Sequence, residues 1–197
     1  MKIIKKLSKP EIQILLGIPV LFLIGGIWHF IYDVIPILPI AIIAPINDSV
    51  WEHMKMGLWP VISWWLIYYS VRKKQDNINK KAWFTAALSA LVVTLLTLPL
   101  IFYFYRSAFG IPMGTPEIPA GGFSLIFDIF ILLLANTFGQ LLGLHLYRRY
   151  KGINTSIAIA LTAFIVLSFV FFTFYQPQIP LFFDFLNDHF GLPDYNF

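Results

Sequence analysis

The chain has 197 residues, of which 58% are hydrophobic and 12% are charged, and its formal net charge is +4. Soluble domains contain about 45–50% apolar and about 25% charged residues, so this composition argues against a soluble enzyme and excludes a disordered chain. The basic residues lie in short segments between apolar runs, so no nucleic-acid partner is expected. Because cysteine is absent, disulfides and cysteine-bound metal sites are excluded.

Long apolar runs follow one another along the chain, at about residues 12–32, 50–71, 82–105, 121–147 and 153–175. Each is long enough to cross a bilayer as an α-helix. None alternates polar and apolar residues as the strands of a membrane barrel do. The sequence therefore predicts an all-α integral membrane protein, with residues 1–197 forming a single transmembrane domain that is a five-helix bundle in the lipid bilayer.

The basic residues predict how this bundle is oriented. All lysines and arginines except Lys55 and Arg106 lie before the first span, in residues 72–81 or in residues 148–151. These segments fall on one side of a five-span topology, and the positive-inside rule places that side in the cytoplasm. We therefore expect a multi-pass protein of the cytoplasmic membrane with a cytoplasmic N-terminus, an extracytoplasmic C-terminus and a first span retained as a signal anchor.

Two apolar segments on the outer side are too short or too rich in proline to span. Residues 34–46 contain Pro36, Pro39 and Pro45, which predicts an interfacial or re-entrant segment. Residues 176–197 are similar, and 180–190 fit a short interfacial helix with Asp184 and Asp188 outward. Both segments are expected to cover the outer ends of the helices as a lid.

The densest polar run is Pro45–Lys55, at the start of the second predicted span. Ser49 and Glu52 match a capping box, and Glu52 lies where a helix dipole favours a carboxylate. A purely structural role explains these two residues, but it does not explain the adjacent His53. Asp128, inside the fourth span, also needs protonation, a cation or a partner such as Lys55 or Arg106.

These residues map to one depth on the outer side and predict a divalent metal site, for which zinc is the best candidate. The expected ligands are His29, His53, Asp128 and Asp33, of which His29 and Asp33 share a helix face. We assign Glu52 as general base and Ser49 as a second catalytic candidate. The candidate substrate-binding residues are Asn47, Trp51, Asn136 and Gln140. His145 and His189 are expected to be an interfacial and a solvated residue.

The run Pro45–Lys55, with the preceding Trp28-His29-Phe-Ile-Tyr-Asp33, resembles a family of bacterial multi-pass membrane proteins of unknown function. That family carries a Pro-x-Asn-Glu-Ser-x-Trp-Glu-His-x-Lys signature, in which Asp48 here replaces the first glutamate. The segment Pro180–Asp184 also resembles that family's tail, so the likeness covers essentially the whole chain. It implies a family of membrane proteins and no activity.

A shorter likeness concerns Asn47–His53 alone. With a gap of two residues, it is similar to the Asn-Glu-Thr-x-x-x-Trp-Thr-His run of the adiponectin and progestin receptor family, whose members resemble alkaline ceramidases that hold zinc in a helical bundle. The span count and the other ligand motifs of that family are not matched here. This likeness adds to the expectation of a metal site.

The sequence leaves several functions open. The first is a membrane-embedded, metal-dependent hydrolase or transferase that acts on a lipid or small apolar substrate at the outer face. The second is a non-catalytic protein that binds or transports a small molecule or lipid. The third is a subunit of a larger membrane complex.

Overall fold

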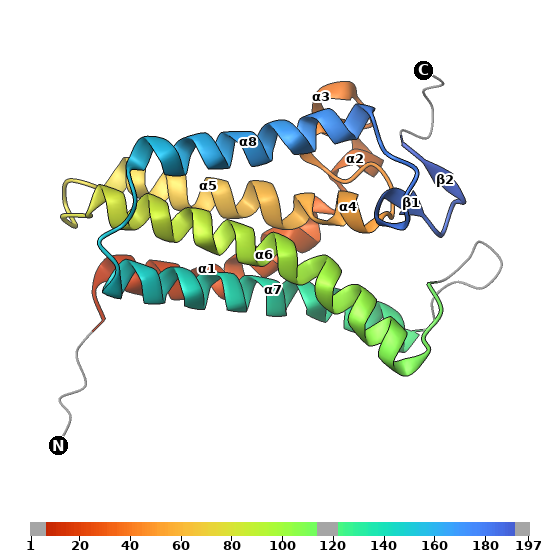
Figure 1. Ribbon diagram of the computed structural model, residues 1–197, viewed down its shortest axis with the longest axis horizontal. Helices are drawn as coiled ribbons and strands as arrows, with labels where there is room; N and C mark the ends of the chain where they lie inside the picture. Colours follow the sequence, from red (N-terminus) through yellow and green to blue (C-terminus); the bar gives the residue numbers. More distant parts are fainter. Residues whose placement is uncertain (1–6, 114–121, 192–197) are drawn as a thin grey trace.

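The computed structural model describes residues 7–113 and 122–191. Long helices lie side by side and run nearly the whole length of the molecule (Figure 1). They are α1 (Lys9–Trp28), α5 (Lys55–Arg72), α6 (Lys80–Phe109), α7 (Gly122–Arg149) and α8 (Thr155–Phe174). The described part of the chain is therefore all-α apart from one very small hairpin near its C-terminal end.

Four helices in the described ranges are long and apolar enough to cross a membrane, which supports a multi-pass membrane protein. These segments are Lys9–Val34, Lys80–Phe109, Ile126–Arg149 and Thr155–Phe174. Helix α5 packs among them but is less apolar, because Lys55 and Arg72 lie at its ends and its sequence contains several tryptophans and tyrosines. The span predicted at residues 50–71 therefore stays a prediction.

Glycines bring the central helices close together. A Cβ at Gly139 of α7 would lie 2.6 Å from the Ala90 carbonyl oxygen of α6, and one at Gly25 of α1 would lie 2.9 Å from the Met56 carbonyl oxygen of α5. Small residues allow this approach, which supplies the dispersion contacts that hold helices together in lipid. Helices α1, α5, α6 and α7 form the core, and α8 packs on its outside against α6.

The basic segments lie together at one end of the bundle. The N-terminus of α1, the α5–α6 connection and the α7–α8 connection all lie at this end (Figure 1). Arg148 pairs with Glu11 at 2.7 Å, and Arg72 pairs with Asp76 at 3.1 Å. The hydrogen bond from Tyr68 and the pairing with Arg72 hold the pKa of Asp76 below its ordinary value.

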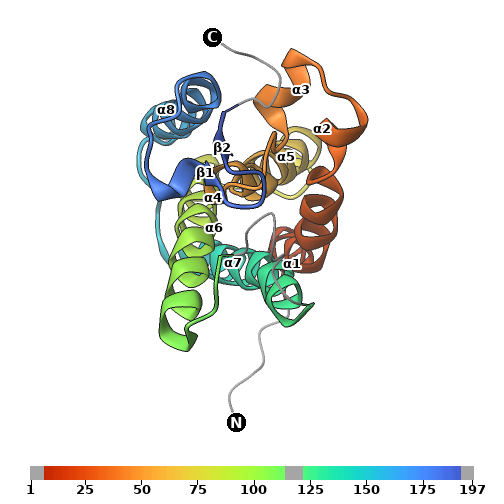
Figure 2. The same cartoon turned by 90° about the vertical axis from the view of Figure 1, so that its right-hand side faces the viewer.

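The opposite end carries the short elements, seen end-on in Figure 2. They are α2 (Ile31–Val34), α3 (Leu38–Ile43), α4 (Val50–His53), the 3₁₀ turn η1 (Pro180–Phe182), β1 (Phe183–Asp184) and β2 (His189–Phe190). Residues 34–46 thus contain the last residue of α2, the whole of α3 and the connections on both sides of α3. Trp28 Nε1 donates to the Ile43 carbonyl at 2.7 Å, which fastens this segment to α1.

The interfacial helix predicted over 180–190 is wrong. The segment forms a hairpin in which β1 and β2 pair antiparallel, with Phe183 opposite Phe190. Asp184 is fully buried rather than outward, and its Oδ1 accepts the backbone N–H groups of Leu186 and Asn187 at 2.9 and 3.1 Å. This side chain competes with helical hydrogen bonding and fixes a turn instead. Residues 192–197 of the predicted outer segment lie outside the described residues.

Candidate metal centre

The predicted second span starts as two helices. Helix α4 is one turn long and is separated from α5 by Met54. The Ser49 cap is confirmed, because Ser49 Oγ accepts the Glu52 backbone N–H at 3.2 Å. The other half of the capping box is wrong: the Ser49 N–H donates to Asn47 Oδ1, and the Glu52 carboxylate accepts the Ile46 N–H at 3.1 Å.

Glu52 forms a buried ion pair with Lys55. Their charged atoms are 2.7 Å apart, and both side chains are fully buried. Lys55 Nζ also donates to the Ala41 carbonyl at 2.7 Å, and Gln176 Nε2 donates to Glu52 at 3.4 Å. Two charges can be buried together only when each is paired and hydrogen-bonded in this way. The pair therefore joins the start of α5 to α3 and to the chain after α8.

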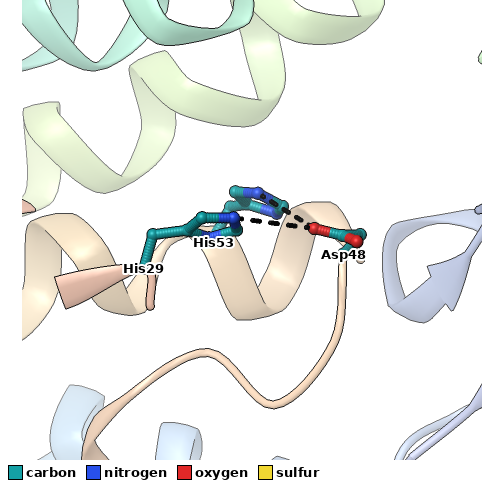
Figure 3. A group of neighbouring side chains, drawn as sticks. All are labelled: His29, Asp48 and His53. Carbon is teal, nitrogen blue, oxygen red and sulfur yellow. Dashed lines mark ion pairs between the residues drawn. The ribbon is translucent and has the colours of Figure 1, made fainter. Parts of the chain in front are cut away.

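His29, Asp48 and His53 form a cluster whose candidate ligand atoms all lie within 4.8 Å of one another. Asp48 Oδ1 is 3.9 Å from His29 Nε2 and 3.8 Å from His53 Nε2. The two imidazoles stack, with ring centroids 4.9 Å apart, and Asp48 lies opposite their nitrogens (Figure 3). Ligand atoms of one zinc ion at about 2.0–2.1 Å are about 3.3 Å apart, so the three side chains would have to move closer together to bind one ion.

The backbone fixes the orientation of His53. Its Nδ1 lies 2.9 Å from the Ser49 carbonyl, which can only accept a hydrogen bond, so Nδ1 carries the proton. The lone pair of the neutral ring is then on Nε2, the nitrogen that faces Asp48. A backbone carbonyl that fixes the tautomer in this way is the usual support of a metal-binding histidine.

A polar pocket of about 520 Å³ adjoins the cluster. His29 follows the end of α1, Asp33 lies in α2, the loop before α4 supplies the four lining residues 45–48, and the hairpin supplies the rest. The full lining is His29, Asp33, Pro45, Ile46, Asn47, Asp48, Asp184, Asn187 and His189. The pocket therefore lies beside the cluster and shares His29 and Asp48 with it.

The hairpin is hydrogen-bonded to the loop that carries Asp48. Asp184 Oδ2 accepts the Asp48 N–H at 3.1 Å, and Asn47 Nδ2 donates to the Gly191 carbonyl at 3.0 Å. His189 Nδ1 lies 3.9 Å from the same Asp184 oxygen. The C-terminal hairpin thus positions one side of the pocket and holds the loop of a candidate ligand.

The structure does not bring Asp128 to the histidines. Asp128 Oδ2 pairs with Arg106 Nη2 at 2.6 Å, and Tyr105 donates to its other oxygen. This is one of the structural pairings that the sequence left open. Asp33 does line the pocket, one helical turn after His29, although it is not among the clustered ligand atoms.

Of the other predicted site residues, Asn47 lines the pocket. Ser49 and Glu52 are fully buried and do not line it. Trp51 stacks on Phe169 with ring centroids 4.2 Å apart and belongs to an aromatic core. Asn136 and Gln140 are fully buried in the bundle and do not line this pocket. Their predicted roles in substrate binding stay predictions.

The sequence did not predict three ionisable residues of the pocket. Asp48 is absent from the predicted ligand set, Asp184 is expected as an outward acid and His189 as a solvated residue. The signal for Asp48 is its place in the same polar run as His53. Nothing in the sequence pattern indicates that the tail folds back to place Asp184 beneath Asp48.

A model of a family of unknown function, DUF6512, matches residues 1–192. The chain belongs to this family. Membership confirms the expectation of a family without an assigned activity and covers every residue of the cluster and of the pocket. No curated protein and no solved structure is recognisably similar to the chain.

Proposed function

We propose that this member of the DUF6512 family binds one divalent metal ion, with zinc as the best fit, through His29, Asp48 and His53. Two imidazoles and one carboxylate are a ligand set that zinc accepts while it keeps a position open for water or substrate. The observation that carries the proposal is the convergence of these ligand atoms within 4.8 Å, from segments separated along the chain. Asp48 takes the place that the sequence assigned to Asp128.

The activity we propose is that of a metal-dependent hydrolase or transferase acting on a lipid-type substrate. A divalent ion at the cluster would polarise a carbonyl or phosphoryl oxygen of the substrate. It would also make a bound water acidic enough to lose a proton and attack the carbon or phosphorus that carries this oxygen. The adjoining pocket of about 520 Å³ has room for a polar headgroup. Four apolar helices next to it support a substrate delivered from the bilayer.

Ser49 and Glu52 act as positioning residues in this proposal. The Ser49 carbonyl orients His53, and the Glu52 carboxylate holds the backbone of Ile46 and the side chain of Lys55. Neither lines the pocket, so neither is assigned a contact with substrate. This assignment replaces the general-base role that the sequence indicated for Glu52.

The pocket end faces outside the cell in this proposal, and the basic end faces the cytoplasm. The positive-inside rule supports that orientation, because the basic connections lie at the end opposite the elements that line the pocket (Figure 1). A fifth span formed by α5 completes the topology.

Metal analysis of the protein purified in mild detergent tests the proposal. After zinc loading and desalting, we expect about one zinc per chain in the wild type and less than about a tenth in Asp48→Asn and His53→Ala. Asp128→Asn and His145→Ala are matched controls, because they change the same residue types away from the cluster, and they should retain the metal.

Two results would contradict the proposal. One is wild-type protein that holds no zinc and no other divalent transition metal after loading. The other is equal zinc content in the wild type and Asp48→Asn, because the ion would then lie elsewhere.

A further inference from the structure

An apolar groove of about 360 Å³ is lined by α5, α6 and α8. Buried side chains such as Trp65 and Trp83 lie in its lining beside the exposed Leu66, Ile159 and Leu167, so the groove opens at the surface of the bundle. Helix α5 ends, and α6 and α8 begin, at the basic end of the molecule (Figure 1). No residue lines both this groove and the polar pocket, so the groove is separate from the candidate metal centre.

The length of the groove matches one leaflet of a bilayer. Its lining residues run from Trp83 to Leu91 on α6 and from Ile159 to Leu167 on α8, which at 1.5 Å per residue is about 12 Å. Half of the hydrocarbon core of a bilayer is about 15 Å thick. Both helices are candidate membrane spans, and an empty groove beside lipid would forfeit dispersion contacts. One acyl chain of a single leaflet therefore fits the groove.

Helix α6 continues the apolar groove to a lysine. Phe84, Ala87 and Leu91 line the groove, and Lys80 precedes Phe84 by four residues. Residues at these spacings lie on one face of a helix. Lys80 thus lies one turn beyond the groove, on the side of the basic end.

Helix α5 leads to a second lysine at the same level. Lys73 Nζ lies 5.5 Å from the centre of the Tyr69 ring, and this ring packs against Phe84 with ring centroids 4.9 Å apart. Because Phe84 lines the groove, the contact between Tyr69 and Phe84 connects Lys73 to its basic end. One cation from each of two neighbouring helices therefore lies beyond this end of the groove.

Both lysines are available to an anion. Lys73 and Lys80 are exposed, and neither forms an ion pair with another residue in the described ranges. Asp76, the acid of the α5–α6 connection, is paired with Arg72 instead. An apolar groove as long as one leaflet thus ends at two unneutralised positive charges.

We propose that this groove binds one acyl chain of an anionic phospholipid, whose phosphate is held by Lys73 and Lys80. Ammonium groups form charge-assisted hydrogen bonds with phosphate oxygens, and basic sites between membrane helices bind anionic headgroups. The inference goes beyond the proposed function, because this lipid is a bound ligand at the end opposite the polar pocket and not the substrate of the metal centre.

Native mass spectrometry of the full chain in mild detergent tests the inference. Palmitoyl-oleoyl phosphatidylglycerol is anionic, and the phosphatidylcholine with the same acyl chains is zwitterionic. We expect the wild type to bind its first phosphatidylglycerol at least about tenfold more tightly than its first phosphatidylcholine. The double variant Lys73→Gln with Lys80→Gln should reduce this preference to less than about threefold.

The double variant Lys9→Gln with Arg149→Gln is the matched control. It removes the same number of positive charges from exposed positions at the same end, but α1 and α7 do not line the groove. The preference for phosphatidylglycerol should therefore stay as in the wild type.

A bulky side chain in the groove tests the place of the acyl chain. Ala163 of α8 is exposed and lines the groove, so the ring of Ala163→Phe would occupy the space of the chain. This variant should bind both lipids at least about fivefold more weakly. Ala160→Phe, at an exposed position of α8 outside the groove lining, should bind them as the wild type does.

Equal affinity of the wild type for the two lipids would overturn the inference. An unchanged preference in the Lys73 and Lys80 double variant, or unchanged binding by Ala163→Phe, would overturn it as well. The metal centre is tested separately, because His53→Ala should lose zinc and keep the lipid preference. Zinc binding without lipid preference overturns only the lipid inference, and lipid preference without zinc binding contradicts only the metal centre.

Discussion

Glu52 and Lys55 show how this bundle accommodates two buried charges. Their side chains are fully buried, 2.7 Å apart and hydrogen-bonded to the backbone of Ile46 and Ala41. Such a pair contributes little net stability over apolar residues of the same size, but the loss of one partner leaves an uncompensated charge. The pair therefore specifies how α3, α4 and α5 meet, next to the candidate metal centre.

We predict that Lys55→Met lowers the free energy of unfolding by about 3–5 kcal/mol, because the Glu52 carboxylate is then buried without a positive charge beside it. The double variant Glu52→Gln with Lys55→Met should lose markedly less. Denaturant unfolding in detergent, followed by tryptophan fluorescence, measures both. Lys74→Met, in the exposed α5–α6 connection, is the control and should unfold like the wild type. Wild-type stability of Lys55→Met would refute this prediction.

Part of the candidate site was predictable from residues alone. His29 and His53 were expected at one end of the bundle, and they stack there. The third member was not predictable, because helical periodicity says nothing about the direction of the loop before α4. Asp128 was also an expected ligand, but it forms an ion pair with Arg106 of the neighbouring helix instead.

Helices α6 and α7 pack closely together at Gly139. A Cβ at Gly139 would lie 2.3 Å from Thr94 Oγ1 and 2.6 Å from the Ala90 carbonyl oxygen. These distances are far below van der Waals contact, and the Ala90 atom belongs to the backbone of a rigid helix. The two helices can therefore pack in this way only with glycine at position 139.

We predict that Gly139→Ala destabilises the bundle by about 1–3 kcal/mol, because α6 and α7 must move apart. Gly26→Ala is the matched control: it also lies within a long helix, but its added methyl group meets nothing within 4 Å. Thermal unfolding of both variants in the same detergent measures the difference. A Gly139→Ala protein as stable as Gly26→Ala would show that the helices are not in this close contact.

Elements rich in apolar residues were predictable, and the tail was not. Length and hydrophobicity alone indicate the helices that satisfy the criteria for a membrane span. The tail has an apolar pattern that also fits a helix, but the Asp184 side chain satisfies the backbone of the turn and of Asp48. Asp48 and Asp184 are 136 positions apart in the sequence, so no local sequence pattern indicates their contact.

The molecule as a whole has two chemically different ends. Basic connections lie at one end, and the short elements whose residues line the polar pocket lie at the other (Figure 1). The positive-inside rule then predicts that the pocket opens outside the cytoplasm. This placement fits a protein that meets its ligand at the outer leaflet.

Because the chain has no cysteine, single-cysteine variants can test this orientation directly. Gln178→Cys lies after α8 at the pocket end, and Lys74→Cys lies in the α5–α6 connection at the basic end. In intact cells, a membrane-impermeant maleimide should label Gln178→Cys, and it should label Lys74→Cys only after permeabilisation. The reverse pattern would invert the orientation, and equal labelling of both would refute a membrane-spanning bundle.

The metal centre is the central claim, and anomalous diffraction at the zinc edge tests it most directly. Crystals of zinc-loaded protein should show one peak at about 2.0–2.2 Å from His29 Nε2, His53 Nε2 and a carboxylate oxygen of Asp48. A peak beside Asp128, or zinc-loaded crystals with both imidazoles turned away from Asp48 and no peak between them, would contradict it.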